Sequence, residues 1–384
     1  MAIFKSKTVT KDGRKWYFSI CYLTANGERK RKKSQLYITK QEAQDAERQF
    51  LMERTNTNRV DITFEELYKS YIEHKKDSIK GSTKYCKDKR VKNHLLPYFG
   101  KMNIHNIEVT TIMGWMAKTN NTTYCNGKKY FSSYKNILLN DLKSILKHGV
   151  KFYELKQNVA NNVTAFHEKN ENIIADEEKI KYITPDEYNL FISVIGNIVF
   201  KTFFAFLYYM GVRKGEAQAL TWEDIFLETD QVRIIKTITI HTNERDEFGN
   251  KFNITNTKNR KNRTIKVPKT LKEMLLELYE YYKKAEGFTE KWYIFGGYKY
   301  LNSTAINNEK DRYFNLVEKT YGKPINRITN HEFRHSHASY LISQGVKIER
   351  IAYRLGDTVG VVLKTYAHLF PEAEDEVIDT LNSI

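Results

Sequence analysis

The stretch Tyr-Met-Gly-Val-Arg-Lys-Gly-Glu at residues 209–216 lies at the end of the most apolar segment of the chain. That segment predicts a buried helix through residues 202–210, because it is apolar on all sides. Gly211 marks the predicted end of the helix, and a group of charges from Arg213 to Glu216 follows directly. Charges at the end of a buried helix are candidates for a functional site.

Two further polar clusters lie downstream. Residues 331–335 read His-Glu-Phe-Arg-His after a predicted helix cap at Thr329 or Asn330, and the spacing of three puts the first His and the Arg on one helix face. Residues 355–357 read Leu-Gly-Asp, and Tyr366 follows the Asp by nine residues. A polar hairpin between the first two clusters contributes the cations Lys258, Arg260, Lys261 and Arg263.

These residue types suit phosphodiester chemistry. A Tyr phenolate can keep the energy of a broken phosphodiester as a covalent phosphotyrosine. A free Tyr has a pKa near ~10 and must be activated by a neighbouring base or by positive charge. Two Arg side chains can bind the non-bridging phosphate oxygens and stabilise the charge of the pentavalent transition state. A Lys on a hairpin can protonate the departing 5′ oxygen. This chemistry requires no metal or cofactor.

The three clusters together resemble the tyrosine recombinase (phage-type integrase) family over about residues 180–370. The family pattern is an Arg after a helix-ending Gly, a hairpin Lys, a His-x-x-Arg helix, a His or Trp after Leu-Gly, and a Tyr nucleophile. The acid that the family usually has three residues after the first Arg is also present. The resemblance implies five catalytic residues, Arg213, Lys258, His331, Arg334 and Tyr366.

The match has one open position and one departure. Counting back from the strand at Arg263 favours Lys258 as the hairpin Lys, with Lys261 as the alternative. Asp357 stands where the family has His or Trp, and an ionised Asp accepts hydrogen bonds rather than donating them. It can orient a neighbouring cation or Tyr366. His335 and His337 are expected to support the helix or the pocket.

Two other functions fit parts of the sequence. The pentad at 331–335 matches HExxH, which on a helix aligns two imidazoles for zinc with Glu332 as base. A zinc peptidase would need a third ligand, such as Glu349 or His368, and leaves Arg213 and Tyr366 unexplained. A non-catalytic DNA-binding regulator would use the positive charge alone.

The charge of the chain points to nucleic acid. Its 384 residues carry a net charge of +17, and 41% hydrophobic residues exclude a disordered basic tail. The net charge falls from +8 in residues 1–60 to +6 in 61–180 and +3 in 181–384. The first half is therefore the stronger platform for a polyanion. Its densest basic run, expected to bind DNA, is Arg29, Lys30, Arg31, Lys32 and Lys33.

The remaining composition places the protein in the cytoplasm. Three widely spaced cysteines form neither a disulfide framework nor a metal knuckle. The N-terminus lacks the apolar run of a signal peptide, and the apolar segment before Arg213 is too short to span a bilayer. We therefore expect a cytoplasmic, nucleoid-associated bacterial protein.

The predicted fold class is mainly α with small β elements (α+β), in the three-domain architecture of a tyrosine recombinase. We expect an arm-type sheet-plus-helix domain at 1–60 and a helical, SAM-like core-binding domain at 61–165. A linker at 166–180 and a mixed α/β catalytic domain at 181–384 follow. Capping boxes predict helix starts after Thr39, Thr63 and Thr184, the last with a proline at the first helical position. Strands are expected at residues 15–23, 232–240 and 263–267, with a turn-rich stretch at 243–262, and Asn26-Gly27 predicts a hairpin turn.

The resemblance also implies a biological setting. A site-specific recombinase of a mobile genetic element would act as a homotetramer on core and arm attachment sites in double-stranded DNA, through a Holliday junction. An excisionase and DNA-bending proteins would be accessory partners, and no membrane is involved. The acidic segment from Glu372 to Ile384 has apolar residues at helical spacing and is expected to pack against a neighbouring subunit.

Overall fold

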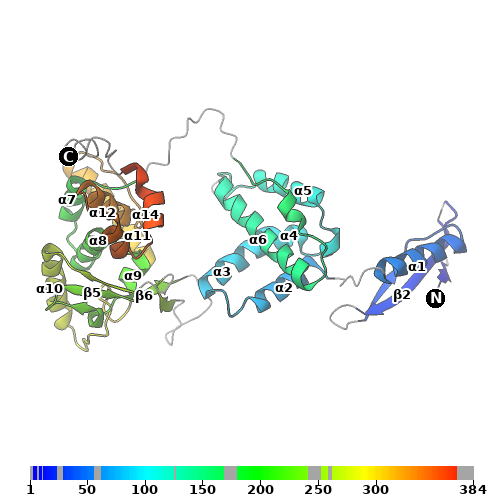
Figure 1. Cartoon of the computed structure of the whole chain (residues 1–384), viewed down its shortest axis with the longest axis horizontal. Helices are drawn as coiled ribbons and strands as arrows, with labels where there is room; N and C mark the ends of the chain where they lie inside the picture. The colour runs from blue at the N-terminus through cyan, green and yellow to red at the C-terminus, as the bar shows by residue number, and fades with distance from the viewer. Residues whose placement is uncertain are drawn as a thin grey trace, which may run out of the picture. The chain divides into compact units, whose positions relative to one another are not determined.

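The protein is known here from a computed structural model. It describes residues 3–6, 8–10, 12–23, 29–55, 62–124, 127–167, 180–240, 252–257 and 262–369. The chain divides into two compact units, Met1–Asn172 and Ile173–Ile384, and each is taken by itself (Figure 1). The predicted turn at Asn26-Gly27, the middle of the predicted linker and the C-terminal segment after residue 369 lie outside the described residues.

The N-terminal unit begins with a three-stranded antiparallel sheet in the order β1-β2-β3. Helix α1 (Lys40–Thr55) packs on β2, where buried Phe18 meets Phe50. The predicted strand and the predicted helix after Thr39 are both confirmed, whereas three-residue β1 is too short to give a periodic signal. The strands are β1 (Ile3–Lys5), β2 (Trp16–Leu23) and β3 (Arg29–Lys33).

The rest of the N-terminal unit is helical. Its elements are α2 (Phe64–His74), α3 (Gly81–Arg90), a π-helical turn (Val91–Leu95), α4 (Leu96–Phe99), α5 (Val109–Asn120), α6 (Ser132–Phe152) and short 3₁₀ turns at Ile104–Asn106 and Val159–Asn162. The predicted capping box is present, with Thr63 and Glu66 satisfying each other's backbone N–H groups. The apolar core includes Trp115 and extends to Phe166, which is 5% exposed.

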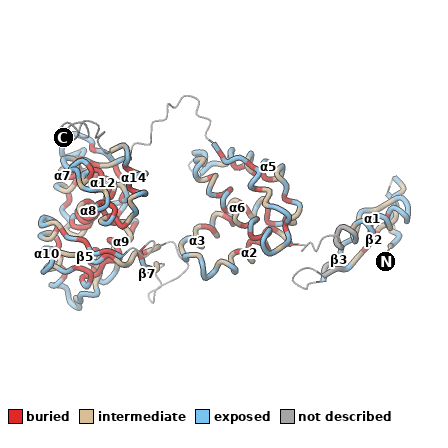
Figure 2. Tube along the Cα trace, viewed as in Figure 1, coloured by how far each residue is buried: buried red, intermediate tan, exposed pale blue. Residues whose placement is uncertain are grey.

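The C-terminal unit is built around the apolar helix that the sequence predicts. Helix α8 (Ile198–Met210) is buried along most of its length and contacts α7 (Pro185–Ser193), α10 (Lys269–Lys283) and α12 (Glu332–Ser343) (Figures 1 and 2). Helix α7 opens with the predicted Thr184 capping box and Pro185. Helix α11 (Ser303–Tyr321) contacts α7.

Two small sheets flank these helices. One has the order β4-β5-β8, from β4 (Ile225–Phe226), β5 (Gln231–Ile234) and β8 (Arg263–Lys266). The other pairs β6 (Lys236–Thr239) with β7 (Asn253–Asn256). The continuous strand expected over residues 232–240 is therefore divided between two sheets, and β7 lies in a stretch expected to be turn-rich.

Three consecutive helices complete the described part of the unit. They are α12, α13 (Ile348–Leu355) and α14 (Val359–Tyr366), and a small apolar cluster that includes Leu355 and Tyr366 joins them. Across the described residues, no helix has the length and apolarity needed to cross a bilayer. The mainly α fold with small β elements is confirmed.

Candidate active site

Arg213 is fixed by the backbone on either side of it. Gly211 ends α8 in the left-handed conformation, with φ of 62°, and a Cβ at this position would collide with the ring of His337. Arg213 is then the N-cap of α9 (Lys214–Ala219). Its backbone N–H donates to Glu216 Oε2 at 3.1 Å and its Nη1 donates to Glu216 Oε1 at 3.1 Å.

Arg334 is fixed by hydrogen bonds to the backbone of two other segments. It is 2% exposed, and its Nη1 donates to the carbonyl oxygens of Gly211 at 2.8 Å and Leu355 at 2.7 Å. This one side chain therefore connects the end of α8, the start of α12 and the end of α13. Its guanidinium group thereby joins Gly211 to helices that follow more than a hundred residues later in the sequence.

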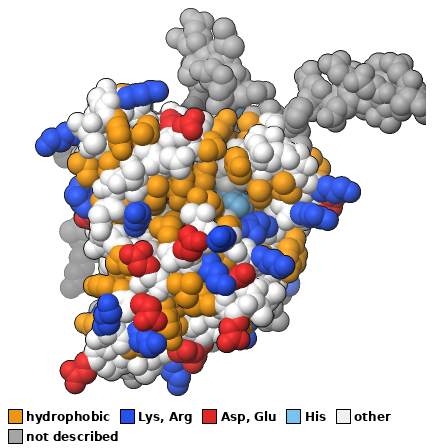
Figure 3. All heavy atoms as spheres, turned by 90° about the vertical axis from the view of Figure 1, so that its left-hand side faces the viewer, with side chains coloured by type: hydrophobic (Ala, Val, Ile, Leu, Met, Phe, Trp, Pro, Cys, Tyr) orange, Lys and Arg blue, Asp and Glu red, His pale blue; other side chains and the backbone are white. Residues whose placement is uncertain are grey.

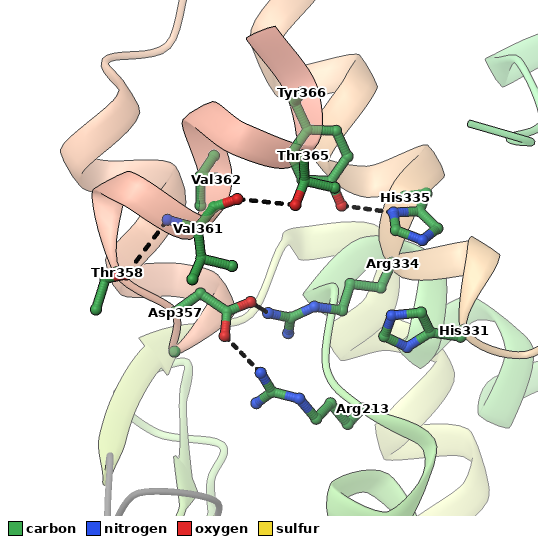
Figure 4. Close-up of a pocket in the computed structure, with 11 residues that line it drawn as sticks. Arg213, His331, Arg334, His335, Asp357, Thr358, Val361, Val362, Thr365 and Tyr366 are labelled. Carbon is green, nitrogen blue, oxygen red and sulfur yellow. Dashed lines mark hydrogen bonds and ion pairs between the residues drawn. The ribbon is translucent and has the colours of Figure 1, made fainter. Parts of the chain in front are cut away.

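Asp357 lies between the two arginines. Its Oδ1 accepts a hydrogen bond from Arg213 Nη2 at 2.5 Å, and its Oδ2 accepts one from Arg334 Nη2 (Figure 4). Burial alone would raise the pKa of Asp357, but the charges of Arg334 and Arg213 lower it below its ordinary value. The carboxylate is therefore ionised at neutral pH and orients both arginines. Orienting a neighbouring cation is one of the two roles that the sequence predicts for Asp357, the other being to orient Tyr366.

Glu216, which accepts hydrogen bonds from Arg213, also forms a buried ion pair with Arg263. Glu216 is 1% exposed and accepts a hydrogen bond from Arg263 Nη2 at 2.7 Å. Arg263 in β8 also donates from Nε to the carbonyl oxygen of Arg354 at 2.9 Å. Burial would raise the pKa of Glu216, but Arg263 and Arg213 lower it. Strand β8 is thereby tied to the arginine after α8.

The tyrosine meets a histidine of α12. Tyr366, at the end of α14, is 4% exposed, and its hydroxyl lies 2.7 Å from His335 Nδ1. His331 is exposed, and its ring meets the ring of His335 edge to face at 4.9 Å between centroids. The sequence already predicts that these two rings lie close together, because residues four apart, such as His331 and His335, share a helix face. His337, in contrast, is buried against α8, and its Nδ1 lies 2.8 Å from the carbonyl oxygen of Tyr208.

One pocket of about 320 Å³ is lined by Arg213, His331, Arg334, His335, Asp357 and Tyr366. Figure 4 shows Tyr366 and His335 at the top, His331 beside Arg334 directly below His335, and Arg213 at the bottom. Thr358 caps α14 by accepting a hydrogen bond from the backbone N–H of Val361 at 3.3 Å. The pocket combines two guanidinium groups, two imidazoles and a phenol, which is a set suited to one phosphate.

The protonation states follow from burial. Burial raises the pKa of the Tyr366 hydroxyl to about 12, with the charge of Arg334 opposing the rise. Burial also lowers the pKa of His335 to about 4, and His331 and Arg334 act in the same direction. Although the residue as a whole is exposed, the partial burial of its ring lowers the pKa of His331, and the charges of Arg334 and Arg213 act in the same direction. At neutral pH the phenol is protonated and His335 is neutral.

The structure thus brings together four of the five expected catalytic residues, Arg213, His331, Arg334 and Tyr366. Lys258 and its alternative Lys261 lie outside the described residues. The basic run at 29–33 belongs to the N-terminal unit. Figure 3 shows one face of the C-terminal unit, on which Lys and Arg side chains alternate with carboxylates and apolar groups.

Two residues of the HExxH pentad have partners other than those that a zinc peptidase would require. Glu332 Oε2 accepts a hydrogen bond from the backbone N–H of Thr329 at 2.5 Å, as a helix-capping side chain does. His335 Nδ1 is engaged by Tyr366. Within the described ranges, no group of three or more His, Cys, Asp and Glu side chains has an arrangement that could hold a metal ion.

Comparison with known proteins follows the same division of the chain. The profile of the "Phage integrase family" matches residues 181–373, that of "Phage integrase, N-terminal SAM-like domain" matches 63–120, and that of "Arm DNA-binding domain" matches 6–53. The chain is 28% identical over 362 residues to the ICEBs1 integrase of Bacillus subtilis (strain 168), covering 90% of each chain.

Solved structures show the same fold. A Tn1549 transposon integrase in complex with a circular intermediate DNA aligns with a TM-score of 0.64 at 16% identity, covering 84% of this chain and all of that one. A lambda integrase tetramer bound to a Holliday junction aligns with a TM-score of 0.57 at 15% identity, covering 91% and 95%. Because the catalytic profile spans about half of the chain, the protein belongs to the phage integrase family, as its three polar clusters predict.

Proposed function

We propose that this protein is a site-specific DNA recombinase of a mobile genetic element, which cuts and rejoins strands through a 3′-phosphotyrosine intermediate. The observation that carries the proposal is the convergence of Arg213, Arg334 and Tyr366 on one pocket from three distant segments. Two guanidinium forks bind the non-bridging oxygens of a phosphate, and they contribute most when the charge develops in the transition state. The phenol supplies the nucleophile.

The Asp357 carboxylate supports this assignment of the phosphate position. A carboxylate with two oxygens between two guanidinium groups occupies the space that two phosphate oxygens would need. The scissile phosphate would replace or share these contacts when DNA enters. Its leaving 5′ oxygen would take a proton from the hairpin lysine, Lys258 or its alternative Lys261.

The N-terminal sheet is proposed as a separate DNA-binding surface. Only some of the cations in residues 29–33 lie on the face of the sheet that is opposite α1. Ser19 pairs with Lys33 and Cys21 with Arg31, and residues paired across strands share a face. Lys32 instead lies 4.4 Å from the ring of Phe50 in α1. Alternation along β3 then puts three cations on the face away from α1, Arg29, Arg31 and Lys33.

The domain limits and partners are proposed in the same terms. Residues 1–60 would bind arm sites, 61–165 and 181–384 would bind core sites, and 166–180 would link them. The matched arm and SAM-like profiles support these assignments. A homotetramer, an excisionase and DNA-bending proteins would complete the reaction, in the cytoplasm and on the nucleoid. The segment from Glu372 to Ile384 would contact a neighbouring subunit.

A covalent trap tests the function. Duplexes selected from a random-sequence pool by binding to the full chain would be nicked beside each phosphate in turn, so that cleavage releases a short strand. Wild-type protein should form a covalent adduct on one of these substrates without added metal, and Tyr366→Phe should bind the same DNA without forming the adduct. Equal behaviour of both proteins would favour the DNA-binding regulator.

A further inference from the structure

In the proposed function, on which this inference rests, the proton on the Tyr366 hydroxyl has to leave when its oxygen attacks phosphorus. With a pKa of about 12, only about one hydroxyl in 10⁵ is ionised at pH 7. The pKa stays above that of free tyrosine, because burial outweighs the charge of Arg334. The site therefore needs a group that accepts this proton.

The contact to His335 identifies that group. Its Nδ1 lies 2.7 Å from the Tyr366 oxygen, and the two rings meet at 64° with 5.6 Å between centroids. Among the described residues, no other hydrogen bond to this hydroxyl is found. A protonated phenol is a donor, so Nδ1 accepts when the imidazole carries its proton on Nε2. His331 contacts the ring of His335 rather than the hydroxyl.

We propose that His335 is a catalytic residue, the base that takes the Tyr366 proton during strand cleavage. The phenolic O–H bond breaks and an N–H bond forms at Nδ1, while the phenolic oxygen bonds to phosphorus. The bond from phosphorus to the 5′ oxygen breaks, and that oxygen takes a proton from a separate donor. In rejoining, a 5′-hydroxyl returns its proton to that donor and attacks phosphorus, the bond from phosphorus to the phenolic oxygen breaks, and the imidazolium gives its proton to the departing phenolate.

Binding of DNA would raise the pKa of His335 and so make it a stronger base. Neutral His335 is able to accept a proton, and burial, His331 and Arg334 lower its pKa. Glu332, on the same helix, acts in the opposite direction. A phosphate between the arginines would offset the charge of Arg334. The pKa of His335 would then move toward the operating pH, where a general base is most effective.

Two substitutions separate a base from a positioning residue. His335→Asn keeps a hydrogen-bonding group close to the position of Nδ1 but cannot take up a proton, and His335→Ala removes both. Both variants should form the adduct on the nicked duplex about 10²–10⁴-fold more slowly than wild type, with unchanged DNA affinity. Tyr340→Ala, on the exposed face of the same helix, is the matched control and should react normally.

Rescue provides a readout that a structural role would not change. A fluorinated tyrosine of lower phenol pKa at position 366 should restore at least tenfold of the rate lost in His335→Asn, because the more acidic phenol needs less help. In wild type it should change the rate much less. Added imidazole should partly restore His335→Ala.

The outcomes are distinct. If His335→Asn reacts at the wild-type rate, or the acidified tyrosine restores nothing, His335 is not the base. If wild type itself forms no adduct on any substrate, the proposed function fails instead. Should His335→Ala lose DNA binding, His335→Asn alone decides the question.

Discussion

Arg213 Nη2 donates a hydrogen bond to Asp357 Oδ1 at 2.5 Å, across 144 residues of sequence. Because the other carboxylate oxygen accepts from Arg334, one acid organises both guanidinium groups of the site. The family usually has a donor, His or Trp, at this position. In this chain the position serves the arginines directly, and the side chain is 22% exposed in the pocket.

Asp357→Asn should lower the free energy of unfolding by about 1–3 kcal/mol at pH 7, because the neutral amide offers one acceptor oxygen where two arginines each use one, and its NH₂ group cannot accept. The pKa of Asp357 is lowered in the folded state. Its contribution is therefore present above its unfolded pKa of about 3.9 and is lost as the pH falls through the folded value. Urea unfolding from pH 7 to pH 3 measures this difference. A gap between wild type and Asp357→Asn that is unchanged below pH 4 would contradict the ion pair.

Arg213→Lys should slow adduct formation by about 10²–10³-fold while leaving DNA affinity within a few-fold of wild type. A lysine keeps the charge but cannot hold Glu216, Asp357 and a phosphate oxygen through one planar fork. Single-turnover cleavage of the nicked duplex measures the effect. Arg312→Lys is the control, because Arg312 is exposed and pairs only with its helix neighbour Glu309 among the described ion pairs. An equal loss in both variants would count against the assigned role.

Arg263→Ala should destabilise the protein by about 3 kcal/mol or more, because it removes a partner of buried Glu216. Arg233→Ala, on the neighbouring strand, should cost at most about 1 kcal/mol, since Arg233 is 45% exposed and lies 3.7 Å from Asp224. Urea unfolding of the two variants gives the comparison. Similar losses would show that the ion pair under Arg213 contributes no more than a surface contact.

Replacing Arg29, Arg31 and Lys33 together with alanine should weaken binding to duplex DNA and reduce the slope of log affinity against log salt by about two to three. Each of these cations is exposed. Lys32→Ala should change the slope by less than about one, because Lys32 lies over Phe50 on the α1 side. Salt titrations with the full chain test this. A larger effect of Lys32 would reverse the assignment of the two faces.

The sequence predicts the parts of the site that depend on local spacing. Gly211 ends α8 as expected, and His331 and Arg334 share the face of one helix. The capping box at Thr184 is likewise readable, because its partner is three residues away. In each case the structural cause lies within about one helical turn.

The contacts that complete the site join distant segments, and local patterns carry no signal for them. The contact of His335 with Tyr366 depends on the packing of α12 against the 3₁₀ turn Ala367–Leu369, which directly follows α14. Asn253–Asn256 is short and begins and ends with asparagine, which is depleted in strands, yet it forms β7 because β6 supplies its backbone partners. Asp357 could be noticed as a departure, but its two partners became known only from the fold.

The most direct measurement is the identity of the amino acid attached to DNA. The adduct trapped on the nicked duplex is digested with protease and nuclease, and the modified peptide is located by mass spectrometry. We expect a 3′-phosphate on Tyr366, no adduct from Tyr366→Phe, and a normal adduct from Tyr353→Phe, whose tyrosine is exposed on α13. A phosphodiester on any other residue, or an adduct that persists in Tyr366→Phe, would contradict the proposed mechanism.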